Sequence, residues 1–178
     1  MAKYLVRAGI LTGLLAAAGA FLFFAGPASR AQEVTAQPDQ TFGDWIYQCA
    51  EVADGKSACS LNQTLVDQQS GQPVLKFSLG RDAGSGRMTL VALLPLGLDF
   101  AAGVSGAVDD NAAFQYGLRT CIGTTCIAIA EVDAGRLGQL KGGTQLKIGF
   151  KMLAEAEPRI LAGSLGGITA ATQAAGFH

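Results

Sequence analysis

Four cysteines are the residues of this chain whose type and spacing could support chemistry. Cys49 and Cys59 flank a segment that contains Gly55, and Cys121 and Cys126 enclose four residues. Two neighbouring thiols can act as a redox-active dithiol, or they can close into a structural disulfide. Neither pair has the C-x-x-C spacing, and neither lies at a recognisable helix N-terminus that would lower a thiol pKa. The spacing therefore favours structural disulfides over redox chemistry.

Other residues that commonly do chemistry are sparse. The single histidine is His178, the last residue, which argues against Ser/His, Cys/His and histidine-rich metal sites. Acidic residues that stand close together flank predicted turns or strand ends, where solvated carboxylates are normal. These pairs are Asp109 with Asp110, Glu131 with Asp133, and Glu155 with Glu157. The glycine clusters complete no phosphate-binding or dinucleotide-binding motif. The sequence thus predicts no catalytic residue, no metal ligand and no cofactor, and it singles out no ligand-binding residue.

The N-terminus indicates the compartment in which the chain works. Lys3 and Arg7 precede an apolar run over residues 8–25, and a proline and small residues follow it. This is the pattern of a secretory signal, so we expect residues 1–31 to be a signal peptide that is cleaved before Gln32. Because positive charge stays on the inner side of the membrane, the remainder should reach the periplasm or cell envelope.

The same apolar run is also long enough for a retained membrane anchor, which is the alternative reading. In that case the chain would be an accessory subunit of an inner-membrane complex, and its helix would pack against that complex through small residues. The contact face would consist of Gly9, Gly13, Ala16 and Ala20. Either reading places the rest of the chain on the periplasmic side.

Export bears on the first cysteine pair, because disulfides form and persist in oxidising compartments. Asp54-Gly55 is a favoured hairpin dipeptide. If it closes a hairpin in which opposed residue numbers sum to 108, Cys49 lies directly opposite Cys59. Opposed residues at a non-hydrogen-bonded site bring their Cβ atoms to about 4.5 Å, close to what a disulfide requires.

The second pair repeats this arrangement around a four-residue loop, with Cys121 opposite Cys126 and Arg119 opposite Ala128. Four cysteines permit three pairings, and local closure selects the one in which each cysteine bonds its neighbour in the sequence. We therefore predict the disulfides Cys49–Cys59 and Cys121–Cys126.

The pattern of the remaining chain predicts one β domain. Residues 32–41 are polar and aperiodic, which indicates a tether, and the domain occupies residues 42–178. Short segments of alternating apolar and polar side chains lie between turns, as in strands. The strand candidates are residues 43–50, 58–67, 73–80, 87–95, 112–121, 126–133, 144–152 and 158–167, with short edge segments within 94–111. Residues 134–143 and 168–178 suit short helices.

These elements predict an all-β fold, an antiparallel β-sandwich or distorted barrel of about eight strands with minor helix. The segment 87–95 is apolar on both sides, so we expect a central strand that is covered on both faces. The aromatic residues Trp45, Tyr47, Phe114 and Tyr116 fall on alternating strand positions, which favours core packing over a ligand surface.

Charge limits the class of partner. After Lys3, Arg7 and Arg30 are removed from the 13 basic residues, ten remain against 14 acidic ones, a net charge of −4 on the mature chain. Nucleic acid and anionic lipid are therefore unsuitable partners. Another envelope or inner-membrane protein is the expected partner.

Several short motifs run in order between about Thr41 and Ala171: FGDWIYQC, CSLNQTL, LLPLGL, FQYGLRTCIGTTCIA, LKGGTQLKIGF and SLGGITAA. Together they resemble the invasion-associated locus B family of alphaproteobacterial envelope proteins. One departure is that Ile168 stands where the family's final element has phenylalanine. The resemblance implies a secreted, all-β, disulfide-containing envelope protein, and it supplies no catalytic residues to carry over. It also implies that the four cysteines match the family's cysteine positions.

Overall fold

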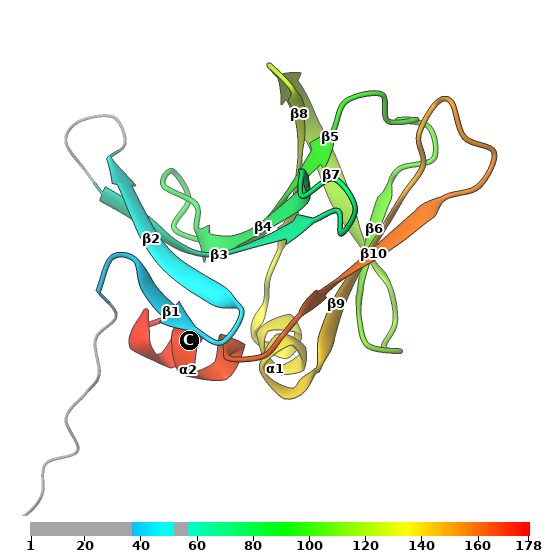
Figure 1. Ribbon diagram of the computed structural model, residues 1–178. Helices are drawn as coiled ribbons and strands as arrows, with labels where there is room; N and C mark the ends of the chain where they lie inside the picture. The colour runs from blue at the N-terminus through cyan, green and yellow to red at the C-terminus, as the bar shows by residue number, and fades with distance from the viewer. Residues whose placement is uncertain (1–36, 52–56) are drawn as a thin grey trace, which may run out of the picture. The chain divides into compact units, whose positions relative to one another are not determined.

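The computed structural model describes residues 37–51 and 57–178 (Figure 1). The predicted signal or anchor segment, with its face of Gly9, Gly13, Ala16 and Ala20, lies outside the described residues. So do the first part of the predicted tether and the Asp54-Gly55 turn.

Within the described residues the chain forms ten strands and two helices. The strands are β1 (Gln40–Phe42), β2 (Trp45–Glu51), β3 (Ser57–Val66), β4 (Pro73–Arg81), β5 (Met88–Pro95), β6 (Val104–Val108), β7 (Phe114–Ile122), β8 (Thr125–Glu131), β9 (Gln145–Phe150) and β10 (Arg159–Ser164). The helices are α1 (Ala134–Gly142) and α2 (Ile168–Ala174). The strands follow the order β1-β2-β3-β4-β5-β8-β7-β6-β9-β10, and neighbours are antiparallel. The predicted all-β, antiparallel class is confirmed, with ten strands in place of about eight.

The sheet curls, so that strands from its two ends pack face to face. Gly163 of β10 lies against Gln63 of β3 and the ring of Phe77 of β4, so closely that a side chain at position 163 would overlap both. The inward positions of the strands fill the space between the two halves with apolar side chains, among them Leu61, Phe77 and Ile148. The result is the sandwich-like, distorted barrel that the strand patterns predicted.

The first strand begins earlier than expected. Gln40 pairs with Tyr47 and Thr41 with Ile46, so the last two residues of the predicted tether belong to the sheet. Their polar side chains gave no apolar alternation from which a strand could be recognised.

The central position of β5 is as predicted, because β4 and β8 flank it. Its cover is not. Leu90, Ala92 and Leu94 face the core and are buried, whereas Val91 and Leu93 on the other face are only half-buried. The expectation that both faces are covered is therefore wrong.

The predicted short edge segments are also wrong, because β6 lies inside the sheet between β7 and β9. A glycine inside this strand has a packing role. A Cβ atom at Gly106 would lie 2.6 Å from the ring of Phe114 and 2.7 Å from that of Tyr116. Glycine in this strand leaves room for the two aromatic rings of its neighbour, β7.

The predicted pairing of Arg119 with Ala128 is wrong as well. Leu118 is opposite Ala128 and Thr120 is opposite Ile127, so Arg119 is an extra residue in β7, a β-bulge. Because side chains alternate along a strand, the extra residue lets Leu118 and Cys121 both face the core side.

The two short segments predicted as helices are helical, and Figure 1 shows α1 and α2 lying next to each other. The Asp133 side chain accepts a hydrogen bond from the Arg136 backbone and caps α1. The hydroxyl of Thr169 in α2 donates to the Lys141 carbonyl at the end of α1 at 2.8 Å. Ile168, the residue at the departure from the family motif, begins α2 and is buried.

Candidate binding groove

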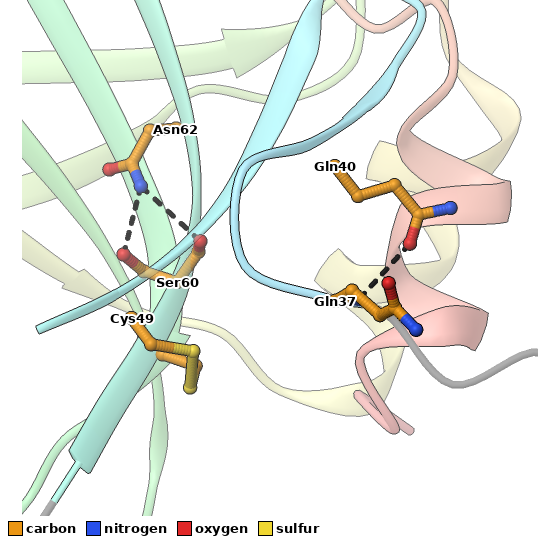
Figure 2. The surroundings of a disulfide bond; sticks show 6 residues. Gln37, Gln40, Cys49, Ser60 and Asn62 are labelled. Atoms are coloured by element: carbon orange, nitrogen blue, oxygen red, sulfur yellow. Dashed lines mark hydrogen bonds between the residues drawn. A yellow bond between two sulfur atoms is a disulfide. The ribbon is translucent and has the colours of Figure 1, made fainter.

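Both predicted cysteine pairs are bonded. Cys49 is bonded to Cys59, which lies directly opposite it across β2 and β3 (Figure 2). Cys121 is bonded to Cys126 across β7 and β8. The Cα atoms are 4.0 and 3.9 Å apart. These separations are closer to the roughly 4.5 Å of a non-hydrogen-bonded antiparallel pair than to the roughly 5.5 Å of a hydrogen-bonded one. The bridges therefore join positions that the sheet already holds together.

The described residues contain no free cysteine, so no thiolate nucleophile is present among them. Cys126 is buried, and the other three cysteines are half-buried in the sheet. The arrangement is that of a covalent clamp on each of two strand pairs. Near the first disulfide, Figure 2 also shows the Asn62 amide donating hydrogen bonds to Ser60 on the same strand, β3.

The acidic residues that stand close together in the sequence serve local structure. Asp109 accepts hydrogen bonds from the Thr144 hydroxyl at 2.6 Å and from the Gln145 backbone at 2.9 Å. These bonds hold the pKa of Asp109 below its ordinary value, with the Thr144 hydroxyl as the largest cause. The turn of Asp109 is thereby tied to the start of β9.

Most of the other acidic candidates are paired with a nearby group. Asp110 forms an ion pair with Lys147, Glu131 with Arg87, and Glu155 with Arg159. Asp133 is the α1 cap. Within residues 37–51 and 57–178, no group of three or more His, Cys, Asp or Glu side chains is placed to hold a metal ion. Neither helix in those ranges has the length and apolar character of a membrane span.

Three segments that are far apart in the sequence meet at one junction. The indole Nε1 of Trp45 donates to the Ser164 carbonyl at 3.0 Å. The Gln63 amide donates to the same carbonyl at 2.9 Å and to the Asp44 carbonyl at 3.3 Å. Trp45 and Gln63 are both buried, so these bonds hold the end of β10 against β2 and β3 in a water-poor setting.

Two glycines allow the backbones at this junction to touch. Gly167 has φ +89°, and a side chain there would overlap the backbone carbonyl of Phe42. Gly43 has φ +59°, and a Cβ atom there would lie 2.5 Å from the Gly166 carbonyl oxygen. The Asp44 backbone N–H donates to that Gly166 carbonyl at 3.1 Å. The motifs FGDW, CSLNQTL and SLGG are therefore the parts of one closure between the two ends of the sheet.

Beyond this junction the two halves of the sheet separate and leave a groove of about 600 Å³. One wall comes from β10 and the other from the end of β3, the start of β4 and the turn between them. The lining residues used below are Leu65, Val66, Asp67, Pro73, Val74, Phe150, Met152, Arg159, Ile160, Leu161 and Ala162. Its volume lies within the range of ordinary ligand sites, which is roughly 300 to 1,000 Å³.

Large apolar side chains are exposed around this groove. Ile160 is 71% exposed and Val66 is 48% exposed, and both line it. Leu153 is 73% exposed and follows the lining residue Met152 in the sequence. Leu96 is 47% exposed. It lies near Leu153 along the backbone, because the carbonyl of Gly97, which follows Leu96, accepts a hydrogen bond from the Leu153 N–H at 2.8 Å. We refer to Val66, Leu96, Leu153 and Ile160 as the apolar rim.

This groove was not predicted from the sequence. The aromatic residues considered as alternative ligand contacts are in the core: Trp45, Phe114 and Tyr116 are buried and Tyr47 is half-buried, as the strand alternation predicted. One available signal was the segment RIL in β10, in which two apolar residues, Ile160 and Leu161, stand side by side. In a strand one of the two must face away from the core.

Comparison with known proteins extends these observations. The family model described as Invasion associated locus B (IalB) protein matches residues 45–176. Two proteins named Invasion protein B homolog, from Brucella abortus strain 2308 and biovar 1 strain 9-941, are each 34% identical over 132 residues, which are 74% of this chain and 75% of the relative. Invasion protein B of Bartonella bacilliformis is 27% identical over 122 residues, 68% of this chain and 64% of that protein.

A solved structure is similar as well. The crystal structure of invasion associated protein B from Bartonella henselae superposes with a TM-score of 0.65 at 27% sequence identity. The match covers 74% of this chain and 90% of that one. These relatives are named as invasion proteins and not as enzymes.

Proposed function

Because this chain belongs to the invasion-associated locus B family, we propose that it is an exported envelope protein that acts by binding another protein rather than by catalysis. The observation that carries the proposal is the groove with its apolar rim. Val66 and Ile160 are exposed in the lining, and Leu153 is exposed next to the lining residue Met152. Exposed apolar side chains gathered at a concave site mark interaction sites.

The two disulfides support the exported part of the proposal, since such bonds persist in oxidising compartments. Cell fractionation, with mass determination of the purified chain, tests it. We expect a periplasmic protein whose first residue is Gln32. An intact N-terminus in the inner-membrane fraction would instead favour the anchored accessory subunit, with residues 8–25 retained as its helix.

The chemistry of the groove supports a protein partner. Its lining combines apolar side chains with a few polar groups, and the net charge of −4 on the mature chain disfavours polyanions. The acidic residues that could have served catalysis are, with the exception of Glu157, hydrogen-bonded or ion-paired in turns and strand ends.

Site-specific photocross-linking in living cells tests the binding role. A photoreactive residue is placed at Ile160 or Leu153 on the rim, and at Ile122, which is 67% exposed but lies beside the second disulfide. We expect one discrete protein adduct from positions 160 and 153 and none from position 122. Equal labelling at all three positions, or labelling at position 122 alone, would contradict the proposal.

A further inference from the structure

The ladder of strands has two ends, and they differ in protection. At one end, β1 is only three residues long, and Figure 1 shows α2 beside it. At the other end, β10 has six residues and pairs with β9 alone among the described strands. Natural proteins usually protect such an edge with lysine, proline, a bulge or a covering element. β10 contains no lysine, no proline and no register shift against β9.

The register shows which backbone groups of β10 are unused by β9. The Asp109 N–H donates to the Gln145 carbonyl at 2.9 Å, so the odd-numbered residues of β9 bond to β6. The Leu165 N–H donates to the Thr144 carbonyl at 2.9 Å, so the even-numbered residues of this segment bond toward β10. Because bonding direction alternates along an antiparallel pair, the N–H and C=O groups of Ile160 and Ala162 point away from β9.

The bonds at Ser164 support this assignment. Ser164 has the same parity as Ile160 and Ala162, and its carbonyl accepts from Trp45 of β2 and Gln63 of β3 rather than from β9. Within residues 37–51 and 57–178, no backbone hydrogen bond uses the outward groups of Ile160 or Ala162. Both residues are exposed.

The groove lies on this free edge. Leu65 and Val66 follow Gln63 along β3, just as Ala162 and Ile160 lie further from the junction along β10, and all four line the groove. At the junction, the side chains of Trp45 and Gln63 bond to the Ser164 carbonyl and so close the gap between β10 and β3. Further along, the same gap is open, and two residues of β10 present unpaired N–H and C=O groups to it.

We propose that this groove binds an extended, uncharged segment of the partner protein, which adds to β10 as a further strand. The inference deepens the proposed function and rests on it, since it specifies how the partner is held. Main-chain hydrogen bonds to Ile160 and Ala162 supply the binding energy, and apolar side chains of the segment contact the lining.

A single strand fits this site better than the sheet edge of a second copy. Neighbouring strands in a sheet lie about 4.7 to 4.9 Å apart, so a paired sheet edge brings its next strand close behind the first. Here Leu65, Val66, Pro73 and Val74 form a wall across the groove from β10, and the groove has a volume of about 600 Å³. A lone extended segment needs room for one strand beside β10, whereas the sheet edge of a second copy must also place its next strand against this wall.

The charged groups of the lining indicate that the segment is uncharged. The Asp67 carboxylate already accepts from the backbone of Gln69 and from both the backbone and the hydroxyl of Ser70. The Arg159 guanidinium is ion-paired with Glu155. The Asp67 Oδ1 atom and the Arg159 guanidinium are thus engaged by neighbouring groups, and these two opposite charges are the charged groups of the lining. The lining therefore favours a segment without net charge, to which it offers apolar contacts and main-chain groups.

The test is calorimetric titration of the exported protein with a capped heptapeptide of alternating threonine and valine as the probe. Ala162→Pro removes the outward N–H without removing a hydrogen bond to β9, and Ala162→Thr is its matched control, because it adds comparable bulk and keeps the N–H. We expect binding to the unmodified protein and to Ala162→Thr, and a dissociation constant at least about tenfold higher for Ala162→Pro.

Two N-methylated probes give the same test without a variant that could misfold. Methylation of the first, third, fifth and seventh amides blocks one edge of the peptide, and methylation of the second, fourth and sixth blocks the other. We expect one of the two to bind like the parent probe and the other to lose binding. Equal binding of both, equal binding of Ala162→Pro and Ala162→Thr, or no binding of the parent probe at millimolar concentration would overturn strand addition.

Two further outcomes separate this inference from the proposed function. If cross-links at Ile160 and Leu153 persist unchanged in Ala162→Pro, strand addition is wrong while the binding role stands. If the rim gives no cross-link even in the unmodified chain, the binding role itself is wrong. A dimer of the exported protein that Ala162→Pro dissociates would overturn the inference by showing that a second copy occupies the edge.

Discussion

The disulfides offer a prediction whose magnitude follows from the structure. In the chain-entropy model, a cross-link stabilises a protein by restricting its unfolded state, and the gain rises with the number of residues in the closed loop. The bridges span sequence separations of 10 and 5 residues. The model then gives about 2.7 kcal/mol for Cys49–Cys59 and about 2.1 kcal/mol for Cys121–Cys126 at 25 °C.

Together the two bridges contribute about 5 kcal/mol, which is a large part of an ordinary unfolding free energy of about 5 to 15 kcal/mol. Reduction of both should therefore lower the melting temperature by about 10 to 20 °C, at roughly 3 °C for each kcal/mol in a domain of this size. Such a loss would also mark the bridges as structural.

The assay compares oxidised and reduced forms of variants that keep one bridge each. Cys121→Ala with Cys126→Ala retains the first bridge, and Cys49→Ala with Cys59→Ala retains the second. Reduction removes no atoms from the core, so the drop on reduction isolates each bridge from the effect of the substitutions. We expect the larger drop for the first bridge, because its loop is longer. A melting temperature that reduction leaves unchanged would refute the structural role.

Three further predictions concern the junction, a turn and the core. Gly167→Ala should lower the free energy of unfolding by about 3 kcal/mol or more in a denaturant titration, because the methyl group overlaps the Phe42 carbonyl. Gly123→Ala is the control, with φ +58° and open space around it, and should lower it by about 1 to 2 kcal/mol. Equal losses would contradict the close contact. Asp109→Asn keeps the left-handed backbone of the turn, at φ 49°, but removes the charge. Since the folded pKa of Asp109 lies below its ordinary value, its stabilisation is present above pH about 4 and is lost as the pH falls through the folded pKa. The variant should therefore melt lower than the unmodified chain at pH 7 and equally at acidic pH, and a gap that persists at low pH would refute this cause. Tyr116→Phe should leave the melting temperature unchanged or raise it, because the Tyr116 hydroxyl is buried and has no partner among the described residues. A large drop would reveal a bond to that hydroxyl.

Local patterns were sufficient to predict much of the sheet. The alternation of Leu146, Ile148 and Phe150 predicted β9, and all three are buried. The hairpin rule that opposed numbers sum to 108 predicted that Cys49 faces Cys59, as they do. These predictions succeed because strand period and hairpin register are set by residues close together in the sequence.

Features that depend on distant residues were not predictable in this way. Nothing in the sequence indicated that Gly106 makes room for the ring of Phe114 in β7. Arg119 gave no sign of the bulge that turns Cys121 to the core side. The bond from Gln63 to Ser164 joins residues 101 apart, and it defines where the groove begins. The candidate site could therefore be located only from the fold.

Amide hydrogen exchange of the purified protein, resolved by residue along β10, tests the open edge most directly. We expect the amides of Ile160 and Ala162 to exchange almost as fast as unstructured ones, while those of Leu161 and Gly163, which bond to β9, are protected. Equal protection of all four amides would contradict it, because the edge of β10 would then already be paired and the groove would not be available to a partner.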